Sequence, residues 1–408
     1  MTSPATRTPA LALDGGTPIR VDSWPGWPHF DDDEQAAALA VLTSGRVNYW
    51  TGEHGRAFER EFADWVGVAH AVTVANGTVA LEIALRAVGV GPGDEVVVPA
   101  ATFIATASAV VACGAQPVVV DVDPLTQCLT AGTVEAALTK RTAAVVVVHL
   151  GGFPADVEPV VRLARRAGLT VVEDCAQAHG AHRDGRTVGT FGDVAAWSFC
   201  QDKIMSTAGE GGAITTADRR VWRRCWEYKD HGKNHDAVFA PDRPPGFRYV
   251  HDSFGTNARL TEVQAAVGRR QLHKVDGWVA IRRAHAARFT AGLSDLSALR
   301  LPAVPRGVGH AFYRYYAHLR PEQLAPGWDR DRVIAALVAE GIPVTYGGCA
   351  EIQRERAFDA SGRRPAVLPN AAVLARTSMT VPVHHRMTDA DVDDVVAAVH
   401  KVLGEATR

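Results

Sequence analysis

Seven short runs of apolar, largely β-branched residues recur in the first half of the chain, and they constrain its fold more than any other feature. The runs occupy residues 69–76, 94–100, 116–123, 142–150, 170–176, 194–199 and 212–216. Amphipathic segments such as residues 157–169 separate them. Strands that are apolar on both sides are typical of a sheet covered by helices on both faces. The sequence therefore predicts an α/β large domain with a mostly parallel, mixed sheet.

The second half of the chain follows a different pattern. Residues 229–253 are rich in Pro, Gly, His and Arg without a clear period, which predicts a long loop, and long ordered loops in compact enzymes are usually functional. Helical segments and one strand follow, at residues 259–293, 313–320, 329–341 and 389–403. We expect residues 1–280 to form the large domain with an N-terminal arm, and residues 281–408 a smaller α+β domain.

Charge and composition exclude several classes of protein. The 408 residues include 43 basic and 45 acidic side chains without a long run of either sign, so the chain lacks the electrostatic pattern of a nucleic-acid binder. No segment has the length and apolar character of a membrane span, and the first twenty residues lack the pattern of a signal peptide. We expect a cytoplasmic protein that binds neither nucleic acid nor membrane.

The six cysteines include no C-x-x-C pair, and each lies in an apolar or strand-like context. Such contexts are typical of reduced, buried thiols. We therefore expect neither a disulfide framework nor a metal site.

The first candidate motif is Asn76-Gly77-Thr78, which lies between an apolar run and a helical segment. A glycine turn that opens a helix presents free N–H groups and the positive end of the helix dipole, and both favour a phosphate. The alternative is a helix N-cap without a ligand.

The second motif is Glu173-Asp174, at the end of the fifth apolar run. Ligands of open α/β sheets bind at the carboxyl ends of the strands. A carboxylate at that position can keep a pyridinium nitrogen protonated and so maintain a cofactor ring as an electron sink. The alternative is a carboxylate that only caps the following turn.

The third motif places Lys203 between the run that ends at Ser198-Phe199 and the glycine-rich turn at residues 209–212. A lysine that leaves a buried strand can be desolvated, which lowers its pKa and suits it to form a Schiff base. The alternative is an ordinary solvated lysine.

The fourth motif covers residues 255–266, where a polar loop containing Asn257 and Arg259 leads into a helix. The alternative is a simple helix N-cap. Arg259 has two possible positions, since it can face the same site as Asn257 or pair with Glu262 on the first helical turn.

Taken together, the four motifs resemble the DegT/StrS family of sugar aminotransferases, which use pyridoxal 5'-phosphate (PLP) and have the aspartate-aminotransferase fold. The resemblance covers nearly the whole chain from about residue 12. It implies that Lys203 is the Schiff-base lysine, that Asp174 is the partner of the pyridinium nitrogen and that Gln177 lies beside the ring hydroxyl. It further implies that Phe103 stacks on the ring, and that Gly77, Thr78 and Ser198 bind the phosphate.

The resemblance also predicts a quaternary structure and a reaction. Asn257 matches the family's asparagine that reaches the cofactor phosphate of the neighbouring subunit, which implies a symmetric homodimer with shared sites. The reaction implied is ping-pong transfer of an amino group from glutamate or glutamine, through the pyridoxamine phosphate (PMP) form, to a ketone. Lys203 would move the proton in both halves, as a general acid–base.

Two rival classes share this fold. One is a PLP lyase or dehydratase, in which histidine replaces the lysine; the other is a regulatory relative without chemistry, which is expected to lose Asp174 or Lys203. Both residues are present. Whether the purified protein is yellow, and whether glutamate or glutamine shifts that colour, would separate the three classes.

The acceptor is predicted from finer resemblances. Residues 47–52 and 229–233 resemble a branch associated with polysaccharide and nucleotide-sugar pathways, whereas Gln201 resembles enzymes that aminate cyclitol ketones of the scyllo-inosose type or make aminohydroxybenzoate. We favour a nucleotide-linked keto sugar and keep the other two as alternatives. His231, Lys233, Arg248 and Arg259 are candidates for binding this substrate, the alternative for the loop residues being a solvated charged loop.

Overall fold

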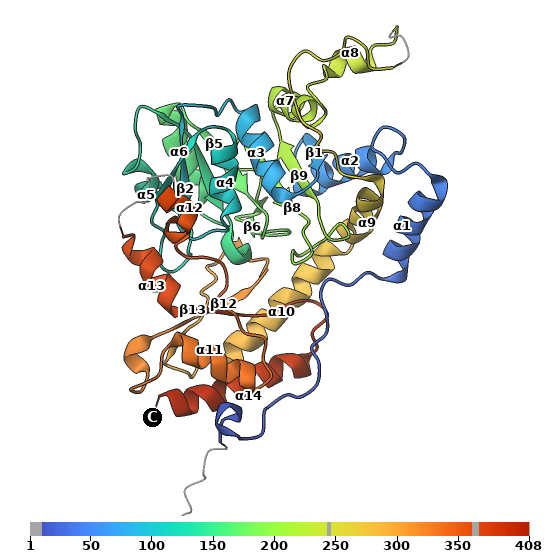
Figure 1. Ribbon diagram of the computed structural model, residues 1–408. Helices are drawn as coiled ribbons and strands as arrows, with labels where there is room; N and C mark the ends of the chain where they lie inside the picture. The colour runs from blue at the N-terminus through green and yellow to red at the C-terminus, as the bar shows by residue number, and fades with distance from the viewer. Residues whose placement is uncertain (1–9, 243–245, 361–366, 408) are drawn as a thin grey trace, which may run out of the picture.

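The computed structural model describes residues 10–242, 246–360 and 367–407, and a seven-stranded sheet forms the centre of the large domain (Figure 1). In sheet order the strands are β1 (His70–Val74), β9 (Gly212–Thr216), β8 (Val194–Ser198), β5 (Thr170–Asp174), β4 (Thr142–Val148), β2 (Glu95–Pro99) and β3 (Gln116–Val120). Strand β9 is antiparallel to both of its neighbours, and the other neighbouring pairs are parallel. All seven apolar runs are strands, so the predicted α/β class and mixed, mostly parallel sheet are confirmed.

Helices cover both faces of this sheet because alternate residues of each buried strand point to opposite sides. Val96 and Val98 belong to the apolar cluster on one face, whereas Val97, between them, belongs to the cluster on the other. The first face packs against α3 (Gly77–Ala87), α4 (Ala105–Ala112) and α7 (Arg219–Lys229). The second face packs against α2 (His54–Val66), α5 (Ala131–Glu135), α6 (Val157–Ala167) and α9 (Glu262–Leu272).

The C-terminal part has a core of its own around a three-stranded antiparallel sheet. Its strands are β10 (Leu299–Arg300), β12 (Tyr315–Leu319) and β13 (Ser378–Val381), and its main helices are α11 (Arg330–Ala339), α13 (Pro369–Thr377) and α14 (Asp389–Ala406). Helix α10 (Val275–Leu293) connects the two parts (Figure 1). The predicted boundary near residue 280 falls inside α10, and the domain limits stay a prediction.

The N-terminal arm packs against the C-terminal part. Leu11 belongs to the core of that part, and Arg20 forms an ion pair with Asp391 at the start of α14. Helix α1 (Asp32–Ser44) follows the arm and contacts α9. The arm therefore ties the first residues of the chain to its last helix.

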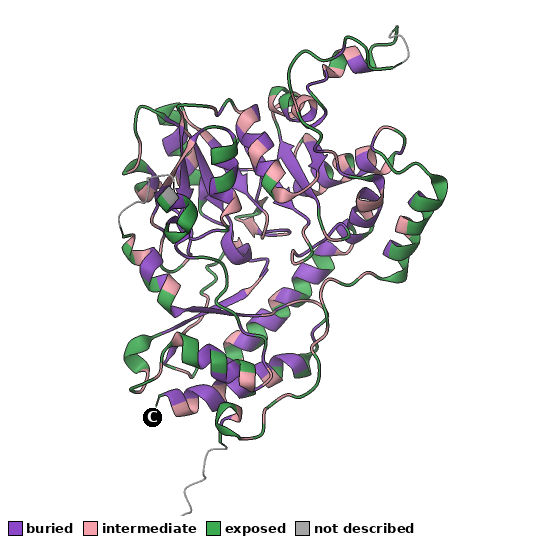
Figure 2. Cartoon of the chain, viewed as in Figure 1, coloured by how far each residue is buried: buried purple, intermediate pink, exposed green. Residues whose placement is uncertain are grey.

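The segment at residues 229–253 departs from the predicted irregular loop in one respect. It contains the short helix α8 (His235–Phe239), whose N-cap Asn234 accepts a hydrogen bond from the N–H of Ala237 at 3.0 Å. Five residues are too few to produce a helical period in the sequence, which explains why this helix was missed. The segment around α8 projects from the body of the large domain beyond α7 and is largely exposed (Figure 2).

The cysteines agree only partly with the expectation of six buried thiols. Cys113, Cys128, Cys175 and Cys225 are buried, but Cys200 is half-buried and Cys349 is exposed. Within the described ranges, no helix is both long enough and apolar enough to span a membrane.

Candidate active site

A cavity of about 800 Å³ lies at the carboxyl ends of the parallel strands. It is lined by residues of the large sheet and by residues around the start of β12 in the C-terminal part. The predicted site residues that line it are Gly77, Thr78, Phe103, Asp174, Gln177, Ser198 and Lys203. Residues that are more than a hundred positions apart in the sequence thus share one cavity, although their individual roles stay predictions.

One end of the cavity is formed by the N-terminus of α3. The Asn76 side chain caps this helix by accepting a hydrogen bond from the N–H of Val79 at 2.9 Å, and the first N–H groups of a helix have no acceptor within it. A Cβ atom added to Gly77 would lie 2.6 Å from the Cβ of Ser198, so only glycine allows this approach. The arrangement provides N–H donors, a hydroxyl and a helix dipole for an anion.

Asp174 lies on the floor of the cavity and is buried. Its carboxylate accepts hydrogen bonds from the Thr106 hydroxyl at 3.0 Å and the N–H of Ala176 at 3.2 Å. Burial raises the pKa of Asp174, because these bonds offset only part of the cost of keeping a charge out of water. A cationic nitrogen beside this carboxylate would supply the missing compensation.

The neighbouring Glu173 has a different role, because adjacent strand residues point to opposite faces. It is fully buried and accepts hydrogen bonds from the N–H groups of Gly189, Phe191 and Gly192, and it lies 3.0 Å from Nε2 of His149. Burial raises the pKa of Glu173, but these bonds, led by the one to His149, outweigh burial and lower it. Cys175 lies close enough to suggest a metal site, yet the carboxylate is already engaged by four donors.

Replacing Glu173 by glutamine is expected to destabilise the fold by about 3 kcal/mol, because an amide N–H would then face backbone N–H groups. The lowered pKa of Glu173 means that its stabilisation is present above the carboxyl pKa of the unfolded chain and is lost as pH falls through the folded value. Urea unfolding should therefore show a smaller difference between the variant and the wild type in acid. Glu158→Gln, at an exposed glutamate, is the control, and an equal effect there would contradict this role.

Gln177 and Phe103 also line the cavity. The Oε1 of Gln177 accepts a hydrogen bond from the N–H of Gly151 at 2.7 Å, which orients the side-chain amide. Phe103 lines the cavity and is 66% exposed. An exposed aromatic ring in a cavity is available for stacking.

Lys203 lies in the cavity beside two groups that its motif did not suggest. Its Nζ is 3.2 Å from Asp202 and 3.5 Å from the hydroxyl of Tyr313, and that hydroxyl also donates a hydrogen bond to Asp202. Burial lowers the pKa of Lys203, but Tyr313 and Asp202 outweigh burial and raise it. The prediction of a lowered pKa is therefore wrong, because acidic groups surround the amine.

These neighbours of the site differ in how far they can be predicted from the sequence. Asp202 directly precedes Lys203, so its position beside the amine was open to inference. Tyr313 lies 110 residues further along the chain and comes to the site only through the packing of the C-terminal part on the large domain. Thr106, on α4, likewise reaches Asp174 only in the folded chain.

The remaining predicted residues do not line this cavity in their own chain. Asp230 is fully buried and forms ion pairs with Lys233 at 2.6 Å and Arg259 at 2.7 Å. It also forms an isolated β-bridge with Asn257, whose side chain is exposed. The alternative pairing of Arg259 with Glu262 is not seen, since Glu262 is buried and accepts hydrogen bonds from the N–H groups at residues 54 and 55.

Lys233 is held inside the loop, between the rings of Trp50 and Phe247, as well as by Asp230. A buried, paired ammonium stabilises the loop and is poorly placed to bind substrate of the same chain. His231 and Arg248 are exposed. Roles for these residues towards substrate stay predictions.

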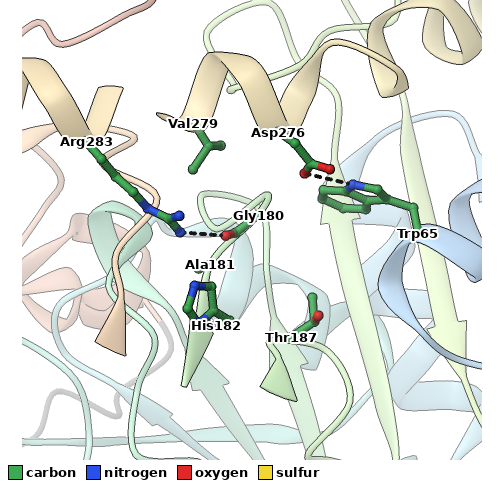
Figure 3. Close-up of a pocket in the computed structure, with 8 residues that line it drawn as sticks. All are labelled: Trp65, Gly180, Ala181, His182, Thr187, Asp276, Val279 and Arg283. Carbon is green, nitrogen blue, oxygen red and sulfur yellow. Dashed lines mark hydrogen bonds between the residues drawn. The ribbon is translucent and has the colours of Figure 1, made fainter. Parts of the chain in front are cut away.

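A separate cavity of about 320 Å³ lies between α10 and a small three-stranded sheet (Figure 3). In sheet order, the strands of that sheet are β11 (Val308–Gly309), β6 (His182–Arg183) and β7 (Arg186–Thr187). Arg283 donates hydrogen bonds to the carbonyl oxygen atoms of His310 and Gly180, and Asp276 accepts one from the Trp65 indole. It shares no lining residue with the cavity around Lys203. Because its charged groups bind the protein itself, we place the chemistry around Lys203.

Comparison with known proteins agrees with this placement. Residues 28–400 match the model of the DegT/DnrJ/EryC1/StrS aminotransferase family. The chain belongs to this family. The predictions of a transaminase, and of PLP and PMP as its cofactor forms, are thereby confirmed.

Several relatives are similar over nearly their whole length. An L-glutamine:2-deoxy-scyllo-inosose aminotransferase of Streptomyces kanamyceticus is 38% identical, over 96% of each chain. A UDP-N-acetyl-3-dehydro-α-D-glucosamine 3-aminotransferase of Acidithiobacillus ferrooxidans is 38% identical, over 88% of this chain and 90% of the relative. The crystal structure of an aminotransferase from Psychrobacter cryohalolentis is 43% identical with a TM-score of 0.92, covering 95% of this chain and 100% of that one.

The charges of the cavity residues, and their positions relative to one another, fit PLP. The α3 N-terminus and Ser198 suit the phosphate, the buried Asp174 carboxylate suits a ring cation, and the Lys203 amine lies in the same cavity. When bound, PLP supplies an electron sink for the carbon from which a proton is removed.

Proposed function

We propose that this aminotransferase moves an amino group from glutamine or glutamate to the ketone of a nucleotide-linked keto sugar, and that it does so in the cytoplasm. The observation that carries the proposal is the size of the cavity. At about 800 Å³, it lies in the upper part of the range of small-molecule sites, roughly 300–1,000 Å³. Such a cavity has room for a sugar beside the cofactor.

The choice of a nucleotide-linked acceptor is supported by two segments. Residues 47–52 and 229–233, which resemble the nucleotide-sugar branch, pack together through a 2.8 Å hydrogen bond from the Trp50 indole to Asp230. The name of the A. ferrooxidans relative includes a UDP-linked keto sugar.

A keto cyclitol is the second candidate acceptor, because the S. kanamyceticus relative is named for a scyllo-inosose substrate at the same identity. An aminohydroxybenzoate-type reaction is the third. The PMP form of the protein, offered a panel of nucleotide-linked keto sugars and keto cyclitols, should return to the lysine-bound form only with the former. Return with cyclitols alone would overturn the proposal.

The chain's own residues divide the work in both half-reactions. Lys203 carries the proton between the substrate carbon and the cofactor carbon, which requires a neutral amine. Asp202 and the Tyr313 hydroxyl, at 3.2 and 3.5 Å from its Nζ, raise the pKa of Lys203 and so favour the protonated form that returns the proton. Asp174 keeps the ring nitrogen protonated throughout.

We further propose a symmetric homodimer in which Asn257 binds the phosphate in the partner's cavity. Asn257 is exposed and does not line the cavity of its own chain. In the same loop, Tyr249 and Phe254 are both 100% exposed. Fully exposed aromatic rings beside a functional loop favour burial by a second subunit.

Mixing an Asn257→Ala chain with a Lys203→Ala chain is expected to restore activity that neither variant shows alone. In a heterodimer, one site combines the intact Lys203 of one chain with the intact Asn257 of the other. If the chains of an equal mixture pair at random, about half of the dimers are heterodimers with one intact site each, so about a quarter of the wild-type turnover should be recovered. Turnover measured after mixing and re-dimerisation checks this, and no recovery in verified heterodimers would contradict a shared site.

A further inference from the structure

A second, smaller cavity adjoins the cofactor cavity on the side of the C-terminal part. Its volume is about 230 Å³, and it is walled by Trp24 and Trp27 of the N-terminal arm and by His384 after β13. The two cavities share Asp202, Tyr313 and Arg314 as lining residues.

A buried arginine forms the inner wall of this cavity. Arg282, on α10, is 2% exposed, and its Nη1 donates hydrogen bonds to the carbonyl oxygen atoms of Val383 at 2.6 Å and Phe312 at 3.2 Å. Its Nε–H has no acceptor, and among the described residues no carboxylate forms an ion pair with it. A buried guanidinium without a counter-charge is costly unless an anion joins it.

A second guanidinium stands between the two cavities. Arg314 is half-buried and lies over the Tyr313 ring at 5.2 Å, and the described part of the chain offers it no ion pair within 4 Å. Burial, together with the positive charge of Arg314, lowers the pKa of Arg282 to about 9. The two cations therefore repel each other, and the carboxylate that lines the cavity, Asp202, is paired with Lys203.

The other polar groups that line this cavity either lack a hydrogen-bond partner or already bind another residue. His384 lines the cavity and has a buried Nδ1 without a hydrogen-bond partner in the described structure. Burial and the nearby Arg282 charge lower the pKa of His384 to about 4, so it stays neutral. Asp202 is the carboxylate that lines the cavity, and it is bound to Lys203 and Tyr313.

We propose that Arg314, backed by Arg282, binds the α-carboxylate of the amino donor. The assignment rests on the proposed amino-acid donor and extends it to a subsite. The α-carboxylate is attached to the carbon whose amine must reach the Lys203 position, and Arg314 lines the cavity that contains Lys203. A guanidinium binds a carboxylate through two parallel hydrogen bonds, which orients the donor.

Two tryptophans strengthen this binding by limiting access of water. Trp27 donates an indole hydrogen bond to the carbonyl oxygen of Lys203 at 2.8 Å, and Trp24 donates one to Gly341 at 2.7 Å. Both rings are thereby fixed at the wall of the cavity. Charge pairs are stronger where solvent is excluded.

The test follows the first half-reaction of the PLP-loaded protein, for which no acceptor is needed. Arg314→Gln is expected to raise the glutamine concentration for half-maximal conversion about 50-fold. It should leave conversion of 4-aminobutanamide, which is glutamine without its carboxylate, nearly unchanged. Arg314→Lys should give an intermediate loss, because lysine keeps the charge but not the paired donors. Arg320→Gln, at an exposed arginine just after β12, is the matched control and should behave as wild type.

A second arm separates the donor carboxylate from a phosphate of the acceptor. In the PMP form, Arg314→Gln should leave the response to the keto-sugar panel unchanged. Equal losses with glutamine and 4-aminobutanamide, or a loss confined to the acceptor half-reaction, would overturn the assignment.

If neither glutamine nor glutamate reacted, the proposed donor would be refuted. A binding measurement would still test the subsite in that case. Calorimetric titration of the PLP-loaded protein with glutarate should show binding that Arg314→Gln removes. Equal binding by the wild type and the variant, or none by the wild type, would overturn the subsite.

Discussion

Replacing Lys203 by alanine is expected to abolish turnover, with a loss of at least about 10⁴-fold in kcat, because one amine both binds the cofactor aldehyde and moves the proton. The visible absorption band of the lysine-bound cofactor should disappear. The fold should persist, since truncation leaves Asp202 hydrogen-bonded to Tyr313. Turnover, absorption and circular dichroism check these three expectations.

Lys140→Ala is the matched control, because Lys140 is exposed near the start of β4. It should keep both activity and absorption. Borohydride reduction of the PLP-loaded wild type, followed by peptide mapping, should place the label on residue 203. A label at any other lysine, or normal turnover in Lys203→Ala, would contradict the assignment.

The large sheet could be predicted because its signal is local. Each strand is a run of a few apolar residues bounded by turn residues, and burial on both faces leaves little ambiguity in such a run. Val96, Val97 and Val98 show this directly, since they pack on alternate faces. Asp174 and Lys203 were predicted for a related reason, because Asp174 is the last residue of β5 and Lys203 lies in the turn that follows β8.

The surroundings of the site could not be predicted in the same way. The raised pKa of Lys203 depends on Tyr313, which reaches the amine through contact between the two parts of the chain. Arg282 has no sequence signal at all, because an arginine in a helix is usually solvated, and only the packing of α10 shows that it is buried. The enclosure of Lys233 by Asp230 and two aromatic rings likewise appears only in the folded chain.

The second large loss of activity is expected on substitution of Asp174, and the surroundings of this carboxylate explain why the loss is large. Burial raises the pKa of Asp174, with the N–H of Ala176 and the hydroxyl of Thr106 opposing that rise in part. A ring cation would complete the compensation, so the carboxylate and the protonated ring stabilise each other. Removing the charge weakens the electron sink when the substrate carbon loses its proton.

Asp174→Asn is therefore expected to retain PLP, since the amide fills the same space and the phosphate groups are untouched, but to lower kcat by about 10³-fold. The measurement is kcat for glutamine-dependent amination beside the cofactor content of the purified variant. Asp64→Asn, on the exposed face of α2, controls for the chemical change and should be silent. Thr106→Val separates charge from positioning, because it removes one hydrogen bond and keeps the carboxylate; its loss should be about tenfold. A rate unchanged in Asp174→Asn would show that the ring nitrogen does not depend on this charge.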